Sequence, residues 1–193
     1  AKGHKSVHEI DHYLGRQNSS YSKDDYRMFF ITNHDENSWN GTVGERMGHN
    51  AANFHVLAST LPQSMPLIYS GQEAGLNKSL AFFEKDQIDW TDTSQFDFYT
   101  KISHLKLQHP CLVNGSEQGS FERINTHNDR VYGFKRVKNN AELLVYVNLA
   151  DHDYQATAPL REDLKYEDIM NGMTIVSEVD IPAHSFLLIT TKP

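Results

Sequence analysis

The sequence is poor in cysteine, in clustered basic charge and in long hydrophobic runs. Its one cysteine, Cys111, cannot form a disulfide within the chain, and a lone thiol is most often a small core residue. No run of Lys and Arg occurs and the net charge is −7, which argues against a nucleic-acid partner. The longest apolar runs, such as LLVYV at 143–147, have the length of a strand, whereas a bilayer needs ~20 residues. We therefore expect neither nucleic acid nor a membrane as a partner.

The chain contains enough apolar material for a folded core. Its 193 residues, 38% hydrophobic and 11% aromatic, allow one large domain or two small ones. The chain begins AKGHKSVHE, with neither an initiator Met nor an apolar signal core, so we expect residue 1 to be internal to a longer gene. The composition leaves the cellular compartment open.

The stretch HEIDHYLGRQN at 8–18 matches the zinc-protease pattern H-E-x-x-H. On a helix, His8 and His12 would lie one turn apart on one face, with Glu9 as a general base. His4 could add a third ligand, because it precedes His8 by one more turn. The pattern alone therefore allows a zinc site.

Two features favour a simpler interpretation of this helix. The longer zinc-protease pattern needs a ligand where this chain has Asn18, a poor partner for zinc. In addition, Ser6 and Glu9 are spaced as a capping box, and Gly15 is a typical helix-ending residue. We expect a short surface helix without metal.

Two apolar runs, at 26–32 and 66–71, predict buried strands. Between them, Thr42 and Glu45 form a second capping box. Apolar residues recur at steps of three and four over 43–61, which predicts one amphipathic helix.

This order of strand, helix and strand predicts a parallel sheet, in which chemistry sits at the carboxyl ends of the strands. Those ends carry polar residues at 33–35 and 70–73. A further helix is expected at 94–109, because Pro110 stops its apolar pattern.

The last part of the chain has the texture of an antiparallel β-sandwich. It consists of short segments of β-branched and aromatic residues separated by polar turns, such as KNN at 138–140. We place the domain boundary near 112–118, which divides the chain into 1–112 and 113–193.

Three motifs carry a resemblance to a known family: FITNHDENSW at 30–39, MPLIYSGQE at 65–73 and FFEKDQIDW at 82–90. Each motif alone is weak, since a polar triplet can simply satisfy loop amides. In this order they resemble the C-terminal part of the catalytic barrel of α-amylases, glycoside hydrolase family 13. In that family the seventh strand ends in F-x-x-N-H-D, as at 30–35 here, and the eighth resembles P-x-I-Y-x-G-Q-E, as at 66–73.

The resemblance implies a fold that is α/β followed by all-β. The last two to three β/α units of a (β/α)8 TIM barrel would precede a small antiparallel β-sandwich. The H-E-x-x-H helix would then be the sixth outer helix of the barrel.

The resemblance also implies roles in sugar chemistry. Asp35 carries over as the catalytic carboxylate that stabilises the transition state, and His34 as a ligand of sugar hydroxyls. Asn33 and Trp39 complete the predicted substrate-binding set, Trp39 by stacking on a glucose ring. We expect Asn33 chiefly to hold the strand end.

The nucleophile and the general acid of the family lie at the ends of barrel strands four and five, for which this chain has no counterpart. We therefore expect the C-terminal part of a retaining hydrolase of α-1,4-glucans or maltooligosaccharides, inactive alone and needing no cofactor or metal. It should self-associate or bind its missing N-terminal part, because open strand edges and apolar faces would be exposed.

Glu73 is expected to have a structural role at the barrel rim, and His55 to be a surface or hydrogen-bonded histidine.

Two alternatives stay open. Transglycosylases, isomerases and α-glucosidases share the N-H-D strand end, so the chain could belong to an enzyme that transfers or isomerises glycosyl groups. It could also be a non-catalytic carbohydrate-binding or subunit-interaction protein that keeps the fold without the acids.

Overall fold

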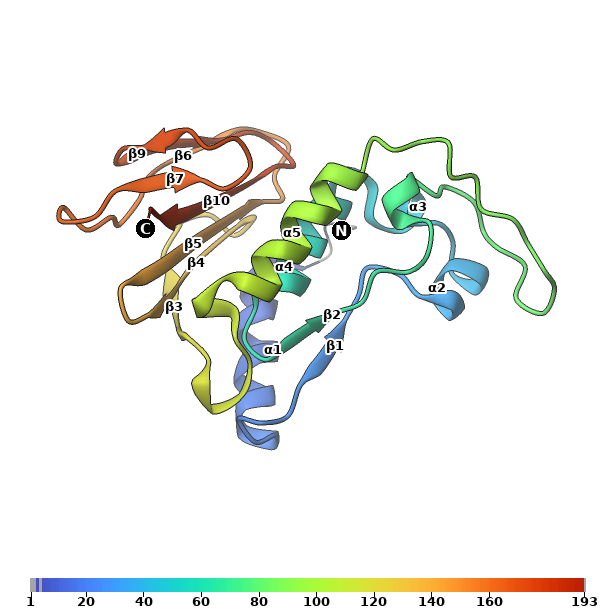
Figure 1. Ribbon diagram of the computed structural model, residues 1–193, viewed down its shortest axis with the longest axis horizontal. Coiled ribbons are helices and arrows are strands. Elements are labelled where there is room, and N and C mark those ends of the chain that lie inside the picture. Colours follow the sequence, from blue (N-terminus) through green and yellow to red (C-terminus); the bar gives the residue numbers. More distant parts are fainter. Residues whose placement is uncertain (1–2, 4, 193) are drawn as a thin grey trace.

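The computed structural model describes residues 3 and 5–192, which form a helical part and a β-domain on one hydrophobic core (Figure 1). The helices are α1 (His8–Ser20), α2 (His34–Trp39), α3 (Val43–Met47), α4 (Ala51–Thr60) and α5 (Phe96–Gln108), with 3-10 turns η1 (Gly48–Asn50), η2 (Gln72–Ala74), η3 (Pro110–Leu112) and η4 (Gly115–Glu117). The strands are β1 (Arg27–Phe29), β2 (Ser64–Pro66), β3 (Ser120–Ile124), β4 (Val131–Lys138), β5 (Ala141–Asn148), β6 (Tyr154–Thr157), β7 (Tyr166–Asp168), β8 (Thr174–Ile175), β9 (Glu178–Ile181) and β10 (Phe186–Thr191). Within the described residues, every helix is too short or too polar to cross a membrane.

The two parallel strands expected from the apolar runs are present. β1 pairs with β2 from Arg27 opposite Ser64 to Phe29 opposite Pro66, and the N–H of Leu67 donates to the carbonyl of Phe29 at 2.8 Å. Both strands are shorter than their apolar runs, and β2 begins earlier than predicted. Among the described residues each of these strands pairs only with the other, so the sheet has two strands. Two β/α units are therefore seen, and a closed barrel stays a prediction.

The predicted helix over 43–61 is interrupted. Its capping box is confirmed, because the Thr42 hydroxyl accepts from the N–H of Glu45 at 3.2 Å and the Glu45 carboxylate accepts from the N–H of Thr42 at 2.8 Å. α3 then ends at Gly48, whose φ of +57° is readily adopted only by glycine. The apolar periodicity continues across the break, which is why the sequence pattern did not reveal it.

α1 begins and ends differently from the prediction. Its N-cap is Val7 without a side-chain cap bond, so the Ser6–Glu9 capping box is wrong. Val7 is 2% exposed and its N–H donates to the carbonyl of Asp129 at 2.9 Å, which fixes the entry to the helix by packing instead. The helix also runs past Gly15, because burial of its apolar face outweighs the cost of about 1 kcal/mol for an internal glycine.

The β-domain has two layers. Six strands form a sheet in the order β3-β4-β5-β10-β7-β8, antiparallel throughout, and β6 pairs with β9 in a separate ribbon. The ribbon packs on one face of the sheet, where Leu144 and Tyr146 of β5 meet Ile181 of β9. The predicted sandwich is thus a six-stranded sheet covered by a two-stranded layer.

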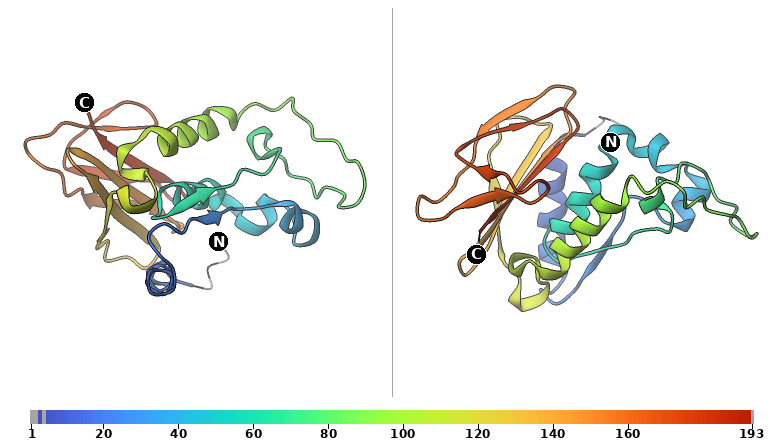
Figure 2. Two further views of the ribbon diagram at one scale, coloured as in Figure 1. Left: turned by 60° about the horizontal axis from the view of Figure 1, so that its bottom comes forward. Right: turned by 45° about the horizontal axis from the view of Figure 1, so that its top comes forward.

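The opposite face of this sheet packs against the helices. Leu143, Val145 and Val147 of β5 share one core with Leu14 of α1 and Val56 of α4. Successive residues of a strand point to opposite faces, so β5 is buried along nearly its whole length. Figures 1 and 2 show α4 and α5 lying between the β-domain and the β1–β2 pair. The division at residues 112 and 113 stays a prediction.

Candidate active site

Asn33 stands where β1 gives way to α2 and caps that helix. Its backbone is extended, and its side-chain oxygen accepts from the N–H of Glu36 at 2.8 Å. Such a cap satisfies a backbone donor that the first turn of a helix leaves free. This bond supports the expected role of Asn33 at the strand end, and its contact with sugar stays a prediction.

His34 and Asp35 form the first turn of α2 and face solvent. Their side chains are 66% and 60% exposed, with the ring Nε2 of His34 3.6 Å from a carboxylate oxygen of Asp35. A carboxylate in the first turn is favoured by the positive end of the helix dipole. The structure therefore presents a histidine and a carboxylate side by side at the carboxyl end of a parallel strand.

Trp39, the last residue of α2, is 63% exposed and lies among other aromatic rings. Its ring centroid is 5.3 Å from that of Phe82 and 6.3 Å from that of Phe83. The ring of His34 is 5.8 Å from Phe82 on the same surface. Phe82 thus joins two of the predicted binding residues, although the sequence analysis did not single it out.

An ion pair between Arg46 and Glu36 joins α3 to α2. The Arg46 guanidinium lies 2.6 Å from the Glu36 carboxylate and donates to the carbonyl of Ile31 at 3.1 Å. Asn40 donates to the same carboxylate at 3.2 Å. Arg46 therefore ties α3 to α2 and to the segment that follows β1. These residues are too far apart in sequence for a local pattern to indicate the contact.

The carboxyl end of β2 forms the neighbouring part of the same edge. Gly71 has a φ of +96°, and its N–H donates to the Glu73 carboxylate at 3.0 Å. Gln72 accepts from the N–H of Tyr69 at 2.9 Å and donates to the hydroxyl of Tyr99 on α5 at 3.0 Å. Glu73 thus stabilises a tight turn, in agreement with its expected structural role.

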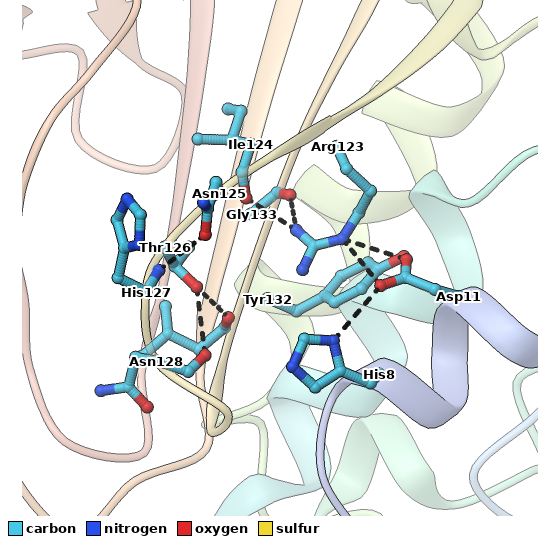
Figure 3. A network of polar contacts seen from close by, with 11 residues as sticks. His8, Asp11, Arg123, Ile124, Asn125, Thr126, His127, Asn128, Tyr132 and Gly133 are labelled. Carbon is cyan, nitrogen blue, oxygen red and sulfur yellow. Dashed lines mark hydrogen bonds and ion pairs between the residues drawn. The ribbon is translucent and has the colours of Figure 1, made fainter.

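The H-E-x-x-H helix is held to the β-domain by the aspartate between its histidines (Figure 3). Asp11 accepts from the Tyr132 hydroxyl at 2.7 Å, and a carboxylate oxygen lies 3.0 Å from Nε of Arg123. Arg123 in turn stacks over the Tyr132 ring at 3.9 Å. Burial and the adjacent carboxylate raise the pKa of Tyr132 far above its ordinary range, so it is a permanent donor. His8 stands at the edge of this cluster, with Nδ1 4.0 Å from Asp11.

This arrangement gives the zinc hypothesis little support. Among the residues described, His, Cys, Asp and Glu side chains nowhere gather in threes so as to hold a metal ion. His8 and His12 are exposed, while His4 lies outside the described residues. Within this stretch it is Asp11 that contacts the β-domain, through Tyr132 and Arg123.

Two further side chains, His55 and Cys111, are buried in the core. His55 is 1% exposed, its Nδ1 makes no hydrogen bond, and burial lowers its pKa to about 4, so its expected surface or hydrogen-bonded setting is wrong. Its ring instead packs against Tyr99 at 4.8 Å and Phe98 at 5.8 Å. Cys111 is fully buried, with its pKa raised by burial and its thiol donating to the carbonyl of Ala141, which confirms it as a core residue.

The chain thus combines a parallel β1–β2 pair with a polar motif at its carboxyl end and an antiparallel β-domain that follows it. Comparison with known proteins shows which proteins share this arrangement. No family model matches the chain. The curated "Beta/alpha-amylase" of Paenibacillus polymyxa is 22% identical over 187 residues, which are 91% of this chain and 15% of that protein.

Solved structures show the same fold. The noncanonic maltogenic α-amylase AmyB from Thermotoga neapolitana matches with a TM-score of 0.77 and 18% identity, over 99% of this chain and 47% of that one. The α-amylase GTA from Geobacillus thermoleovorans, solved with acarbose, matches with a TM-score of 0.77 and 13% identity, over 97% of this chain and 44% of that one. The chain has the fold of the C-terminal portion of α-amylase-family enzymes, glycoside hydrolase family 13, and spans less than half the length of these structures.

Proposed function

We propose that this chain supplies the transition-state-stabilising side of the active site in a retaining α-glucan hydrolase. The observation that carries the proposal is the Asn33-His34-Asp35 segment at the carboxyl end of β1, beside the glutamine-containing turn that follows β2. Asp35 is assigned the catalytic carboxylate, and His34 and Trp39 bind sugar. Asn33 orders the segment and borders the substrate.

The chemistry explains why these residue types are needed. Retaining cleavage of a glycosidic bond uses a carboxylate nucleophile and a carboxylic acid, and passes through an oxocarbenium-like transition state. A fixed carboxylate near the sugar ring binds that positive charge more tightly than the neutral ground state, which lowers the barrier. A histidine beside it can hydrogen-bond the ring hydroxyls as the ring distorts.

The exposure of Asp35 indicates what the rest of the enzyme must add. With 60% of its side chain exposed, water screens this carboxylate strongly, and electrostatic stabilisation is weak at high dielectric. Walls from the part of the barrel that carries the nucleophile and the acid would exclude this water. We therefore expect the 193-residue chain alone to be inactive.

The proposal is tested by Asp35→Asn in the whole enzyme acting on maltooligosaccharides. We expect kcat to fall by about 100-fold or more, the scale of losing a key electrostatic group. His34→Ala should be milder, since a neutral hydrogen bond contributes about 0.5–1.5 kcal/mol. Asp97→Asn, a surface position on α5 that is 77% exposed, is the matched control and should leave kcat unchanged.

An Asp35→Asn enzyme that keeps most of its kcat would refute the assignment. Analysis of the products distinguishes hydrolysis from its alternative. Shorter oligosaccharides alone support a hydrolase, whereas accumulation of longer or isomerised oligosaccharides would assign the chain to a glycosyl-transferring or isomerising enzyme.

A further inference from the structure

An exposed cluster of aromatic side chains continues the candidate active site beyond Asp35. Phe83 is 85% exposed, Trp39 63% and Phe82 38%. The rings of Phe82 and Phe83 are 4.8 Å apart and inclined at 74°, and Phe82 also neighbours Trp39 and His34. Large apolar side chains gathered on a surface indicate a contact that the isolated chain leaves unmade.

The loop that carries the two phenylalanines is fastened to α2. Asn37, which is 1% exposed, donates to the carbonyl of Lys78 at 3.0 Å and accepts from the N–H of Leu80 at 2.8 Å. The hydroxyl of Ser38 donates to the carbonyl of Leu80 at 2.8 Å. These three bonds join the loop to the same short helix that presents His34 and Trp39. The loop lies at the end of the molecule away from the β-domain, beside α2 (Figure 1).

The loop is also closed on itself by Asp86. Its carboxylate pairs with the Lys78 ammonium and accepts from the N–H groups of Ala81 and Gln87 at 3.0 and 2.8 Å. The bond from Lys78, followed by these backbone bonds, lowers the pKa of Asp86 to about 2. Phe82 and Phe83 thus stand on a segment that is hydrogen-bonded at both ends. The loop therefore loses little conformational entropy when a ligand binds.

We propose that Phe82 and Phe83, together with Trp39, form a stacking platform for glucosyl units of the α-glucan that lies over Asp35. This inference rests on the proposed function and extends it to a binding subsite. The apolar C–H face of a pyranose fits an exposed aromatic ring, while its hydroxyls need polar partners at the rim. Glu84 and Lys85 follow directly and are exposed, which supplies an acceptor and a donor. Continuity with His34 through Phe82 favours the substrate itself over a separate protein partner.

The platform makes a kinetic prediction that differs from that for Asp35. Sugar units bound away from the reacting bond contact the enzyme equally in the ground state and the transition state, so they lower KM without changing kcat. The Phe82→Ala/Phe83→Ala double variant of the whole enzyme should raise KM for maltoheptaose by about tenfold and leave kcat within about twofold. KM for a short substrate such as maltotriose should change less.

Controls separate this proposal from the proposed function. Phe96→Ala, at an exposed phenylalanine (44%) at the start of α5, should leave KM unchanged. The Phe82→Trp/Phe83→Trp variant keeps aromatic rings at both positions, so its KM for maltoheptaose should stay close to that of the unaltered enzyme. An unchanged KM for maltoheptaose in the double alanine variant overturns the platform while leaving the role of Asp35 intact. A fall in kcat equal to the rise in KM also overturns it, because the rings would then act on the chemical step. If Asp35→Asn is fully active, the proposed function fails whatever the platform does.

Discussion

At the scale of single residues, His55 is a side chain that couples folding to pH. Burial holds its pKa near 4, while an unfolded chain titrates it at its ordinary value of 6.5. Between these values the unfolded state binds more protons than the folded state, so the free energy of unfolding falls as pH drops from 6.5 to 4. The full effect is on the order of 3 kcal/mol.

Urea denaturation at pH 7, 5.5 and 4.5 measures this loss. His55→Leu should flatten part of the dependence, with His109, whose pKa burial also lowers to about 4, retaining the remainder. His104→Leu, at an exposed position on α5, is the matched control and should follow the parent. Equal acid sensitivity in His55→Leu and the parent would show that His55 does not carry the effect.

The residues of the candidate site differ in how far the sequence could predict them. Asn33, His34 and Asp35 follow an apolar run within a motif, so a local pattern marks them. Phe82 also lies in a sequence motif, at 82–90, but the motif does not indicate that its ring neighbours His34. That contact follows from the hydrogen bonds that join α2 to the loop at 78–80. His55 looked like a surface residue because nothing in its helix indicates that α5 covers it.

At the scale of elements, Asp11 links α1 to β3 and β4 of the sheet through one carboxylate. Asp11→Ala should lower the free energy of unfolding by about 2 kcal/mol, because it leaves a buried tyrosine hydroxyl and a guanidinium without their acceptor. Tyr132→Phe should cost about 1 kcal/mol. The double variant should lose less than the sum, since both changes remove the same bond.

His8→Ala is the control for this cycle and for the zinc hypothesis. Its ring is 65% exposed and 4.0 Å from Asp11, so its removal should leave the free energy of unfolding unchanged with or without added zinc. Strictly additive losses for Asp11 and Tyr132 would contradict the shared bond, and stabilisation by zinc that His8→Ala abolishes would revive the metal site.

Element types were more predictable than element ends. Periodicity indicates α5, which buries one face through Tyr99, Ile102 and Leu105, and Pro110 follows its end as expected. It also indicates α4, although that helix is buried on every side over 55–60, polar residues included. The break at Gly48 and the extension of α1 past Gly15 depend on what the helices pack against, which periodicity does not contain. The two-sided burial of β5 likewise follows from tertiary packing, since helices cover one face and the β6–β9 ribbon the other.

At the scale of the whole molecule, the β1–β2 pair is the surface that remains open. Met28 is 54% exposed, Met65 49%, Phe30 38% and Ile68 36%. Among the described residues, these two strands pair only with each other, so their outer edges offer free backbone donors and acceptors. Unpaired edges flanked by apolar side chains favour association with another chain.

We therefore expect the isolated chain to self-associate or to retain a bound N-terminal part of its enzyme. Light scattering after size exclusion should give a mass above 22.1 kDa that rises with concentration or includes a second polypeptide. Met28→Lys/Met65→Lys should shift the chain toward a monomer, because two charges beside the strand edges oppose pairing. Val176→Lys, at an even more exposed apolar position (70%) in the β-domain, should not. A sharp monomer peak for the unaltered chain at every concentration would contradict this. The two-stranded sheet would then be stable with both edges open, and nothing in its apolar surface would call for the rest of a barrel.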